Sequence, residues 1–431
     1  MASEWRYMTL REAGVQLFDC DHRTPTAVAE GVPYIAIPQL KDGRIDFSGA
    51  RRISHEDFIE WTRKTRPTAG DIVLSRRCNP GETAVVPEHV EFALGQNLVL
   101  LRADGVRSDN GFLRWAVRGP EWWEQIGKFI NVGAVFESLR CKDILDFELR
   151  FPPIHAQRSI ASLLNILDSN VSDLRLQSGT LDAIARTIFK SWFVDFDPVR
   201  AKAEGREPDG MDAATAGVFP GEIKESKSGA IPLGWSSSPF DSIADFLNGL
   251  ALQKYPVSSG EDSVPAIKIA QLKRRSTEGA DRISARLPAK YLVHDGDLIF
   301  SWSGSLEVDV WCGGEGALNQ HLFKVTSETY PQWFIYGWLL QHLEHFREIA
   351  ASKVTTMGHI QRHHLHDATV VVPTSEALQG LGELMQPLHE RVIQSRLQMR
   401  TLAELRDTLL PRLISGKLRV PEAEKLVEAM L

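Results

Sequence analysis

The chain has 431 residues, of which 43% are hydrophobic and 24% are charged, as in an ordinary soluble globular protein. Its formal net charge of −7 argues against a free-standing nucleic-acid binder, which would usually be basic. No apolar run approaches the ~18 residues of a membrane span, and we see no signal peptide. We therefore expect a cytoplasmic protein of two or three domains with no membrane partner.

The cysteines do not form a metal-binding or disulfide pattern. The sequence holds four, Cys20, Cys78, Cys141 and Cys312, and they are widely separated with no Cys-x-x-Cys pair. This usage fits a reducing compartment and argues against a zinc finger. We expect all four to be structural.

The first 153 residues are predicted to form a globular module of mixed strands and helices. Apolar runs at 70–75, behind a Gly-Asp turn, and at 97–102 predict strands. Helical periodicity covers 111–129. A last short strand at 147–151 ends at Pro152, and proline suits the first turn of the helix that follows.

A long helix is predicted over 154–193, because its apolar residues recur at alternating gaps of four and three. This is the a/d seam of a coiled coil. The predicted seam residues of this helix are Ile160, Leu164, Leu167, Val171, Leu174, Leu181 and Ile188. At about 1.5 Å per residue the helix spans roughly 55–60 Å, which is long for a globular domain and natural for a spacer. The following stretch, 194–232, is rich in proline and glycine and predicts an ordered connector with little regular structure.

The second half of the chain repeats the first. Gly-Asp-Leu-Ile-Phe-Ser at 296–301 matches Gly-Asp-Ile-Val-Leu-Ser at 70–75, and matched strands are predicted at 321–326 and 369–372. A second module is therefore predicted over 233–373, and a second long helix with a C-terminal tail over 374–431. The predicted seam of this second helix is Leu381, Met385, Leu388, Val392, Met399, Leu402 and Leu409.

This repeat predicts a mixed α/β fold of the α+β type. Two similar globular domains would be joined by two long antiparallel coiled-coil helices, related by a pseudo-twofold axis. Two unrelated amphipathic helices in a large protein are the alternative.

Basic residues also gather at matching places in the two modules, where they form either a phosphate-binding face or a solvated surface. These residues are Lys41, Arg44, Arg51, Arg52, Arg63, Lys64, Arg66, Arg76 and Arg77, and then Lys268, Lys273, Arg274, Arg275, Arg282, Arg286 and Lys290.

Two sequence motifs lie at the C-terminal ends of the long helices. They are Phe-Lys-Ser-Trp-Phe-Val-Asp-Phe-Asp-Pro-Val-Arg-Ala-Lys at 189–202 and Leu-Leu-Pro-Arg-Leu-Ile-Ser-Gly-Lys-Leu at 409–418. Together with the order module, helix, connector, module, helix, these motifs resemble the specificity subunit of type I restriction–modification systems over nearly the whole chain.

The resemblance implies a DNA-binding, non-catalytic protein. Each module would be a target recognition domain that reads one half of a bipartite double-stranded DNA site, and the rod would set the gap between the halves. The helices would dock two methyltransferase subunits, and the assembly can recruit restriction subunits. The resemblance implies no cofactor, metal or catalytic residue in this chain; S-adenosylmethionine is expected in the partner methyltransferase subunit.

Candidate base-reading residues follow from side-chain chemistry, since Arg, Asn, Gln, Ser and Thr in loops read base edges. In the first module the candidates are Ser75, Arg76, Arg77, Gln96 and Asn97. In the second they are Ser301, Trp302, Ser303, Asn319, Gln320 and His321, with Lys353, Thr355, Thr356, Gly358 and His359 before the last strand. A turn or capping role is the alternative for each of them.

Enzyme functions find little support in the sequence. Residues 79–82, Asn-Pro-Gly-Glu, lack the second proline and the aromatic residue of an amino-methyltransferase motif, and no phosphate-binding loop is present. Asp195 and Asp197 lack the acidic-x-Lys pair of a nuclease. The cluster at His359, His363, His364 and His366 has zinc-like spacing, but the first module does not repeat it. The alternatives to DNA recognition are a coiled-coil protein-interaction adaptor and a self-contained methyltransferase or nuclease.

Overall fold

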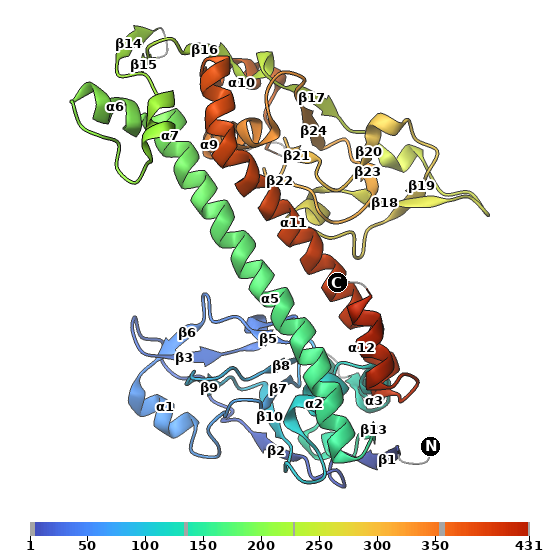
Figure 1. Ribbon diagram of the computed structural model, residues 1–431. Helices are drawn as coiled ribbons and strands as arrows, with labels where there is room; N and C mark the ends of the chain where they lie inside the picture. The colour runs from blue at the N-terminus through green and yellow to red at the C-terminus, as the bar shows by residue number, and fades with distance from the viewer. Residues whose placement is uncertain (1–4, 133–136, 227–228, 353–357, 430–431) are drawn as a thin grey trace. The chain divides into compact units, whose positions relative to one another are not determined.

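The computed structural model describes residues 5–132, 137–226, 229–352 and 358–429 (Figure 1). The chain divides into two compact units. Unit 1 is Met1–Asn170 with Leu402–Leu431, and unit 2 is Val171–Thr401. Both units combine strands and helices, and each takes part of the two long helices, α5 (Ile154–Lys190) and α11 (Ser375–Ile414). The five-part division drawn from the sequence stays a prediction.

Unit 1 is built on a four-stranded antiparallel sheet with strand order β2-β10-β7-β8. A second sheet has the order β6-β3-β9, in which β3 and β9 run parallel, and β1 pairs with β13. The strands that form these sheets are β1 (Arg6–Thr9), β2 (Gln16–Asp19), β3 (Val32–Ile35), β6 (Arg51–Ile53), β7 (Ile72–Ser75), β8 (Thr83–Val85), β9 (Ala93–Leu94), β10 (Leu98–Arg102) and β13 (Glu148–Phe151). The short hairpins are β4 (Leu40–Lys41) with β5 (Arg44–Ile45), and β11 (Asn131–Val132) with β12 (Glu137–Ser138). The helices of the module are α1 (His55–Trp61), α2 (Asn110–Ala116), α3 (Pro120–Phe129) and α4 (Cys141–Ile144).

Unit 2 repeats this topology. Its sheets have the orders β17-β24-β21-β22 and β19-β18-β23-β20, again with one parallel pair, β18 with β23, and β16 pairs with β25. The strands of these sheets are β16 (Ser236–Pro239), β17 (Asp245–Asn248), β18 (Ser263–Ile267), β19 (Arg282–Ser284), β20 (Leu292–Val293), β21 (Leu298–Ser301), β22 (Val308–Val310), β23 (Gly316–Leu318), β24 (Leu322–Thr326) and β25 (Thr369–Val372). The helices of this module are α8 (Ile269–Arg274), α9 (Gln332–Ala351) and α10 (Arg362–Asp367), and α12 (Val420–Glu428) follows α11 in unit 1. The predicted fold class and the strands predicted from the repeat are confirmed.

The long helices run antiparallel. In unit 1 the early part of α5 meets the late part of α11, where Arg406 contacts Asp168. In unit 2 the late part of α5 meets the early part of α11, and Arg186 and His389 line one shared pocket. Every predicted seam residue is buried or partly buried. Among the described residues, each helix is too short or too polar to span a lipid bilayer.

The connector is more regular than the sequence suggests. After α5 comes a π-helical turn (Ser191–Asp195), then α6 (Asp197–Ala203), α7 (Ala213–Val218) and a hairpin of β14 (Ile223–Ser226) and β15 (Gly229–Pro232). The expectation of little regular structure was wrong because local caps compensate for the helix breakers. Proline occupies the first turn of α6, and Asp212 caps α7 by accepting a hydrogen bond from the Thr215 amide at 2.9 Å.

Gly337 in α9 tests how tightly the aromatic core of unit 2 is packed. A Cβ atom added there would lie 2.3 Å from the ring of Phe189, which itself packs against Trp338 and Phe193. We expect Gly337→Ala to destabilise the protein by about 1–3 kcal/mol through overpacking. Gly179 in α5 is the matched control, since nothing lies within 4 Å of its Cβ position. There the same change should stabilise by roughly 0.5–1 kcal/mol in urea unfolding; equal effects at both positions would contradict the packing argument.

Candidate nucleic-acid interface

Three segments of unit 1 meet around Arg76, directly after β7. The Arg76 amide donates a hydrogen bond to the Asn97 carbonyl at 2.9 Å, and the Leu139 amide donates to the Arg76 carbonyl at 2.9 Å. Arg77 also forms an isolated bridge with Ser138. The backbone therefore holds residues 75–77, 95–97 and 137–139 together. We call these segments the recognition loops of unit 1.

Unit 2 builds the same arrangement around Trp302. Its amide donates to the His321 carbonyl at 3.3 Å, and the Ile360 amide donates to the Trp302 carbonyl at 2.9 Å. Ser303 forms the isolated bridge to His359. Residues 301–303, 319–321 and 358–360 are thus the recognition loops of unit 2. The backbone contacts match those of unit 1, whereas the side chains differ.

In unit 1 the candidate side chains divide into buried and accessible ones. Ser75 is fully buried, and its hydroxyl donates to the Arg77 carbonyl at 3.0 Å. The buried Arg76 donates from Nη1 to the Leu139 carbonyl at 3.3 Å. Both therefore hold the loops together, while Arg77 and Gln96 are exposed and Asn97 is partly exposed. The base-contact role of these five residues stays a prediction.

In unit 2 the candidate side chains form a connected polar and aromatic cluster. The Ser303 hydroxyl lies 2.8 Å from Nδ1 of His321, and Nε2 of Gln320 lies 3.3 Å from Nε2 of the same ring. The Trp302 ring centroid lies 6.0 Å from that of His321 and 6.3 Å from that of His359. This cluster offers several hydrogen-bonding groups beside an aromatic ring.

The remaining candidates of unit 2 differ in accessibility. Ser301 and Asn319 are buried, and the Ser301 hydroxyl donates to the Ser305 carbonyl at 2.6 Å. The carbonyl of Gly358 accepts the Gly304 amide at 2.8 Å. Three further candidates, Lys353, Thr355 and Thr356, lie outside the described residues.

A cavity of about 360 Å³ adjoins the recognition loops of unit 1. Some of the residues that line it are not among the candidates identified from the sequence. Its lining includes Gln96 and Asn97, but also Tyr34 and Arg51 from distant segments. The Gln96 amide donates to the Tyr34 hydroxyl at 3.2 Å, and burial raises the pKa of that phenol. The sequence gives no signal for this part of the lining, because sheet pairing brings Tyr34 beside Ala93.

The two basic clusters are partly neutralised. Arg44 pairs with Asp168 and Arg275 pairs with Asp309, so these two arginines serve the module and not a phosphate face. Other members also pair with acids within their own unit, namely Lys41, Arg66, Lys268 and Arg286. Four exposed members have no ion pair, side-chain hydrogen bond or cation–π contact among the described residues, namely Arg63, Arg77, Lys273 and Arg274. These four are the free cations of the clusters within the described part of the chain.

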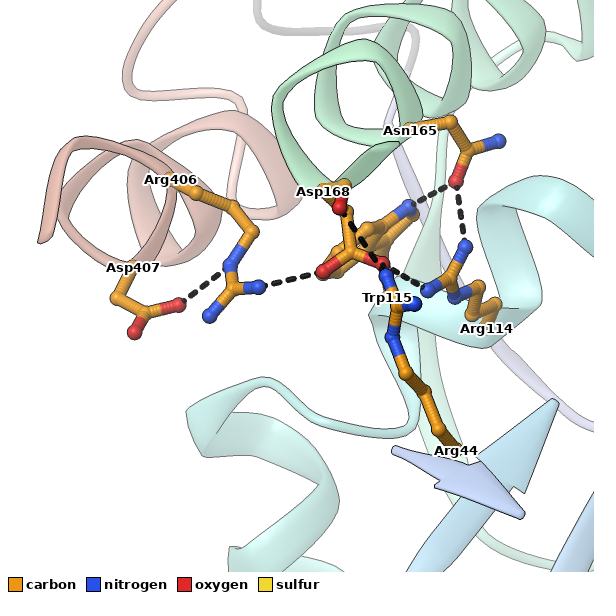
Figure 2. A network of polar contacts seen from close by, with 7 residues as sticks. All are labelled: Arg44, Arg114, Trp115, Asn165, Asp168, Arg406 and Asp407. Atoms are coloured by element: carbon orange, nitrogen blue, oxygen red, sulfur yellow. Dashed lines mark hydrogen bonds and ion pairs between the residues drawn. The ribbon is translucent and has the colours of Figure 1, made fainter. Parts of the chain in front are cut away.

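A buried carboxylate fixes the module of unit 1 to its helices (Figure 2). Asp168 on α5 is 3% exposed and accepts from Arg114, from Arg44 Nη2 at 2.5 Å and from Arg406 Nη1 at 2.5 Å. Asn165, one turn earlier, accepts from Arg114 at 3.1 Å and from Trp115 at 2.9 Å. One acidic residue therefore joins β5, α2, α5 and α11. We call this set the Asp168 network.

Unit 2 has a similar ion-pair network, but the acid lies on the module and the arginine lies on the long helix. Here the buried acid, Asp309, lies on β22 of the module, and the arginine, Arg396, lies on α11. Arg396 Nη1 donates to Asp309 at 2.8 Å, and Arg275 Nε donates at 2.5 Å. The module carrying the recognition loops is thereby fixed to a long helix in each unit.

Stability should depend on pH through Asp168. Burial alone would raise the pKa of this carboxyl group, but Arg114, Arg44 and Arg406 outweigh burial and lower it below its ordinary 3.8. A lowered folded-state pKa gives stability that is complete above the unfolded-state pKa, about 3.9, and is lost as pH falls through the folded-state value. We expect the difference in urea-unfolding free energy between wild type and Asp168→Asn to persist from pH 7 to about pH 4 and to shrink below it. A difference that shrinks between pH 7 and pH 5 would point to another group.

The histidine cluster does not form a metal site in the described part of the chain. There, the potential ligand atoms that converge within 4.8 Å of one another belong to Asp19, Cys20 and His22, not to residues 359–366. Burial raises the pKa of the Cys20 thiol to about 12.

Comparison with known proteins gives consistent matches. No protein-family model matches the chain. The MjaIX type I restriction enzyme specificity subunit of Methanocaldococcus jannaschii is 26% identical over 385 residues, covering 87% of this chain and 83% of the relative. The HindI specificity subunit of Haemophilus influenzae is 22% identical over 66% of this chain and 72% of its own length. The EcoBI specificity subunit of Escherichia coli is 26% identical over 45% of this chain and 36% of its own.

A solved structure gives the same result for the fold. The S subunit of a type I restriction-modification system from M. genitalium superposes with a TM-score of 0.53 at 15% sequence identity, covering 95% of this chain and 96% of that one. At this identity the likeness concerns the fold alone, and the fold includes two long helices and two similar modules. In sequence and in fold, the chain is a relative of the specificity subunits of type I restriction–modification systems.

Proposed function

We propose that this chain is the non-catalytic DNA-recognition subunit of a type I restriction–modification complex. The single observation that carries the proposal is the doubled set of recognition loops, which keeps one backbone arrangement and changes the side chains. Arg76, Asn97 and Ser138 in unit 1 correspond to Trp302, His321 and His359 in unit 2. A scaffold that presents different side chains at one place is suited to reading two different short sequences.

The accessible side chains in these loops suit base reading. Arg77 can donate two hydrogen bonds to a guanine edge, and Gln96 and Asn97 can each both donate to and accept from an adenine edge. In unit 2, Gln320 and His321 provide the hydrogen-bonding groups, and the Trp302 ring provides an apolar surface. The bipartite target would follow, with one half read by each module and the helical rod setting the unread spacer.

Partners are expected to complete the interface. The chain carries a net charge of −7, whereas phosphate contacts made by cations supply most of the affinity for DNA. Two methyltransferase subunits, docked on the helices and carrying S-adenosylmethionine, would close around the duplex and perform the chemistry. Restriction subunits would join through the same assembly, and the complex would act in the cytoplasm.

The test is methylation mapping of host DNA with and without the chain, together with its neighbouring methyltransferase. A bipartite adenine-methylation pattern that disappears when the chain is deleted would support the proposal. An unchanged methylation map and no co-purifying methyltransferase would overturn it in favour of a protein-interaction adaptor. Methyl transfer by the purified chain alone would instead reveal a self-contained enzyme.

The rod gives a second prediction. Inserting four residues into both long helices at matching places, after Ser178 and after Met399, adds roughly 6 Å to each helix. We expect the methylated sites to keep both half-sequences while the unread spacer lengthens by about two base pairs. Methylation mapping of the insertion variant measures this directly. Altered half-sequences would contradict a spacer role, and a single insertion in α5 alone serves as the control for disrupted helix pairing.

A further inference from the structure

A cavity of about 490 Å³ opens in unit 1 beside the start of α5 and the start of α12. We call it the terminal pocket. Its lining includes Trp5, Ala156, Ser159, Gly416 and Val420. Trp5 is only partly buried, and Ser159 and Gly416 are exposed. The pocket thus combines the Trp5 ring and small side chains with polar and basic ones, namely Tyr7, Arg150, His155 and Arg419.

The internal repeat identifies the counterpart of this pocket in unit 2. Strand β1 pairs with β13 as β16 pairs with β25, with Arg6 opposite Phe151 and Ser236 opposite Val372, so Trp5 corresponds to Trp235. On the long helices, Ser159 of α5 corresponds to Gly380 of α11, 221 residues later.

The ends of the long helices match as well. Gly416 corresponds to Phe196, since both have a left-handed backbone, with φ of 73° and 56°, and both lie against the matching tryptophan. The proline in the first turn of α12, Pro421, likewise corresponds to Pro198 of α6. Four lining residues of the terminal pocket, Trp5, Ser159, Gly416 and Pro421, therefore have counterparts in unit 2.

In unit 2 the counterpart site is filled by α7 and the residue after it. Val218 lies 3.0 Å from the Cβ position of Gly380. Phe219 is 2% exposed, with its ring centroid 5.4 Å from that of Trp192 and 6.3 Å from that of Trp235. As a result Trp235 is 1% exposed, whereas Trp5 keeps an accessible face. Among the described residues, no segment of unit 1 takes the place of Val218 and Phe219.

A lysine completes the filled site. Lys202 on α6 donates from Nζ to the carbonyls of Ala216, at 3.0 Å, and Phe219, which closes the C-terminal end of α7. Lys425 occupies the matching position on α12, four residues after Pro421, as Lys202 is four residues after Pro198. Lys425 is exposed and has no hydrogen bond or ion pair among the described residues. By analogy with Lys202, it can donate to the carbonyls of a similar helix end.

We propose that the terminal pocket docks a short helix of a partner protein, one that ends in an aliphatic residue followed by an aromatic residue. This helix reproduces the contacts of Val218 and Phe219, and Lys425 closes its C-terminal carbonyls as Lys202 does in unit 2. The proposal is independent of DNA recognition, because it rests on the filled and open copies of one site. The small side chains of Ala156 and Ser159 leave room for the aliphatic residue, and Trp5 stacks on the aromatic one.

The probe is a fluorescein-labelled synthetic peptide with the sequence of residues 204–221, titrated with the full chain in a polarisation assay. We expect saturable binding of this peptide. The same peptide carrying Val218→Asp and Phe219→Ser should bind at least about tenfold more weakly. In the protein, Ser159→Trp should fill the pocket and weaken binding by about tenfold or more, and Lys425→Ala should weaken it by about fivefold. Glu424→Ala, the exposed neighbour on α12, is the matched control and should leave binding unchanged.

Each outcome decides the proposal. No saturation at about 1 mM chain, or equal binding of the two peptides, overturns it. Binding that survives Ser159→Trp also overturns it, since the peptide is then displacing residues 204–221 of the chain from their site in unit 2. Thermal unfolding shows whether the tryptophan variant folds, and Ser159→Leu is the milder block that keeps the test decisive if it does not. A negative result in this binding assay does not change the result expected from methylation mapping. Failure of the docking proposal is therefore distinct from failure of the DNA-recognition function.

Discussion

Replacing Asp168 with alanine is expected to lower the free energy of unfolding by about 3–5 kcal/mol. The carboxylate is almost completely buried and pairs with Arg44, Arg114 and Arg406. Among the described residues it is the one acid that pairs with Arg44 and Arg114. Removing it leaves guanidinium groups buried beside one another, and the Arg114 side chain is only 15% exposed. The loss arises from uncompensated charge more than from the lost bonds themselves. Urea unfolding followed by circular dichroism measures it.

The same network supplies a matched control. Asp407 pairs with Arg406 at 2.8 Å, but its side chain is 60% exposed, so Asp407→Ala should cost less than about 1 kcal/mol. The double replacement of Asp168 and Arg406 should cost less than the sum of the two single replacements, because each single variant strands the other charge. If Asp168→Ala and Asp407→Ala had similar effects, the burial argument would be wrong.

Periodicity and internal repetition predicted much of the fold. The seam of α5 recurs in α11, and the Gly-Asp turns before β7 and β21 precede strands of matching register. These features are local in the sequence, so they can be recognised from one amino-acid sequence alone. Because of the repeat, each element is indicated twice in the sequence, and the order of modules and helices is therefore predictable.

Long-range polar contacts were not predictable in the same way. Arg44 and Arg406 lie 124 and 238 positions from Asp168, and nothing in the spacing of charged residues indicates that they converge. The same limit explains why the sequence groups Arg44 with a basic cluster that forms either a phosphate-binding face or a solvated surface. Burial also decides the role of a polar residue near a strand end. Ser75 and Ser301 follow the pattern of base-reading residues, yet both are fully buried and bond to backbone carbonyls.

Replacing His321 with alanine should impair recognition of one half of the DNA target and leave the other unchanged. Its ring interacts with Ser303 and Gln320, so its loss removes one hydrogen-bonding group and releases two others. A lost base contact of this kind costs about 1–3 kcal/mol, or roughly 5- to 150-fold in methylation of the native site. Arg77→Ala should have an effect of similar size on the opposite half. Methylation mapping of the two variants, each in complex with the methyltransferase, compares the half-sequences directly.

The control for this pair is Lys273→Ala, which removes an exposed cation on α8 in the module of unit 2. A phosphate contact carries no sequence information, so this variant should weaken methylation evenly across sites and reduce its salt dependence. The informative result is the assignment of each variant to a half-site. If His321→Ala and Arg77→Ala relaxed the same half, the two sets of recognition loops would not act as separate readers. Opposite halves would mean that one backbone arrangement, duplicated within a chain, acquires two specificities through a few side chains.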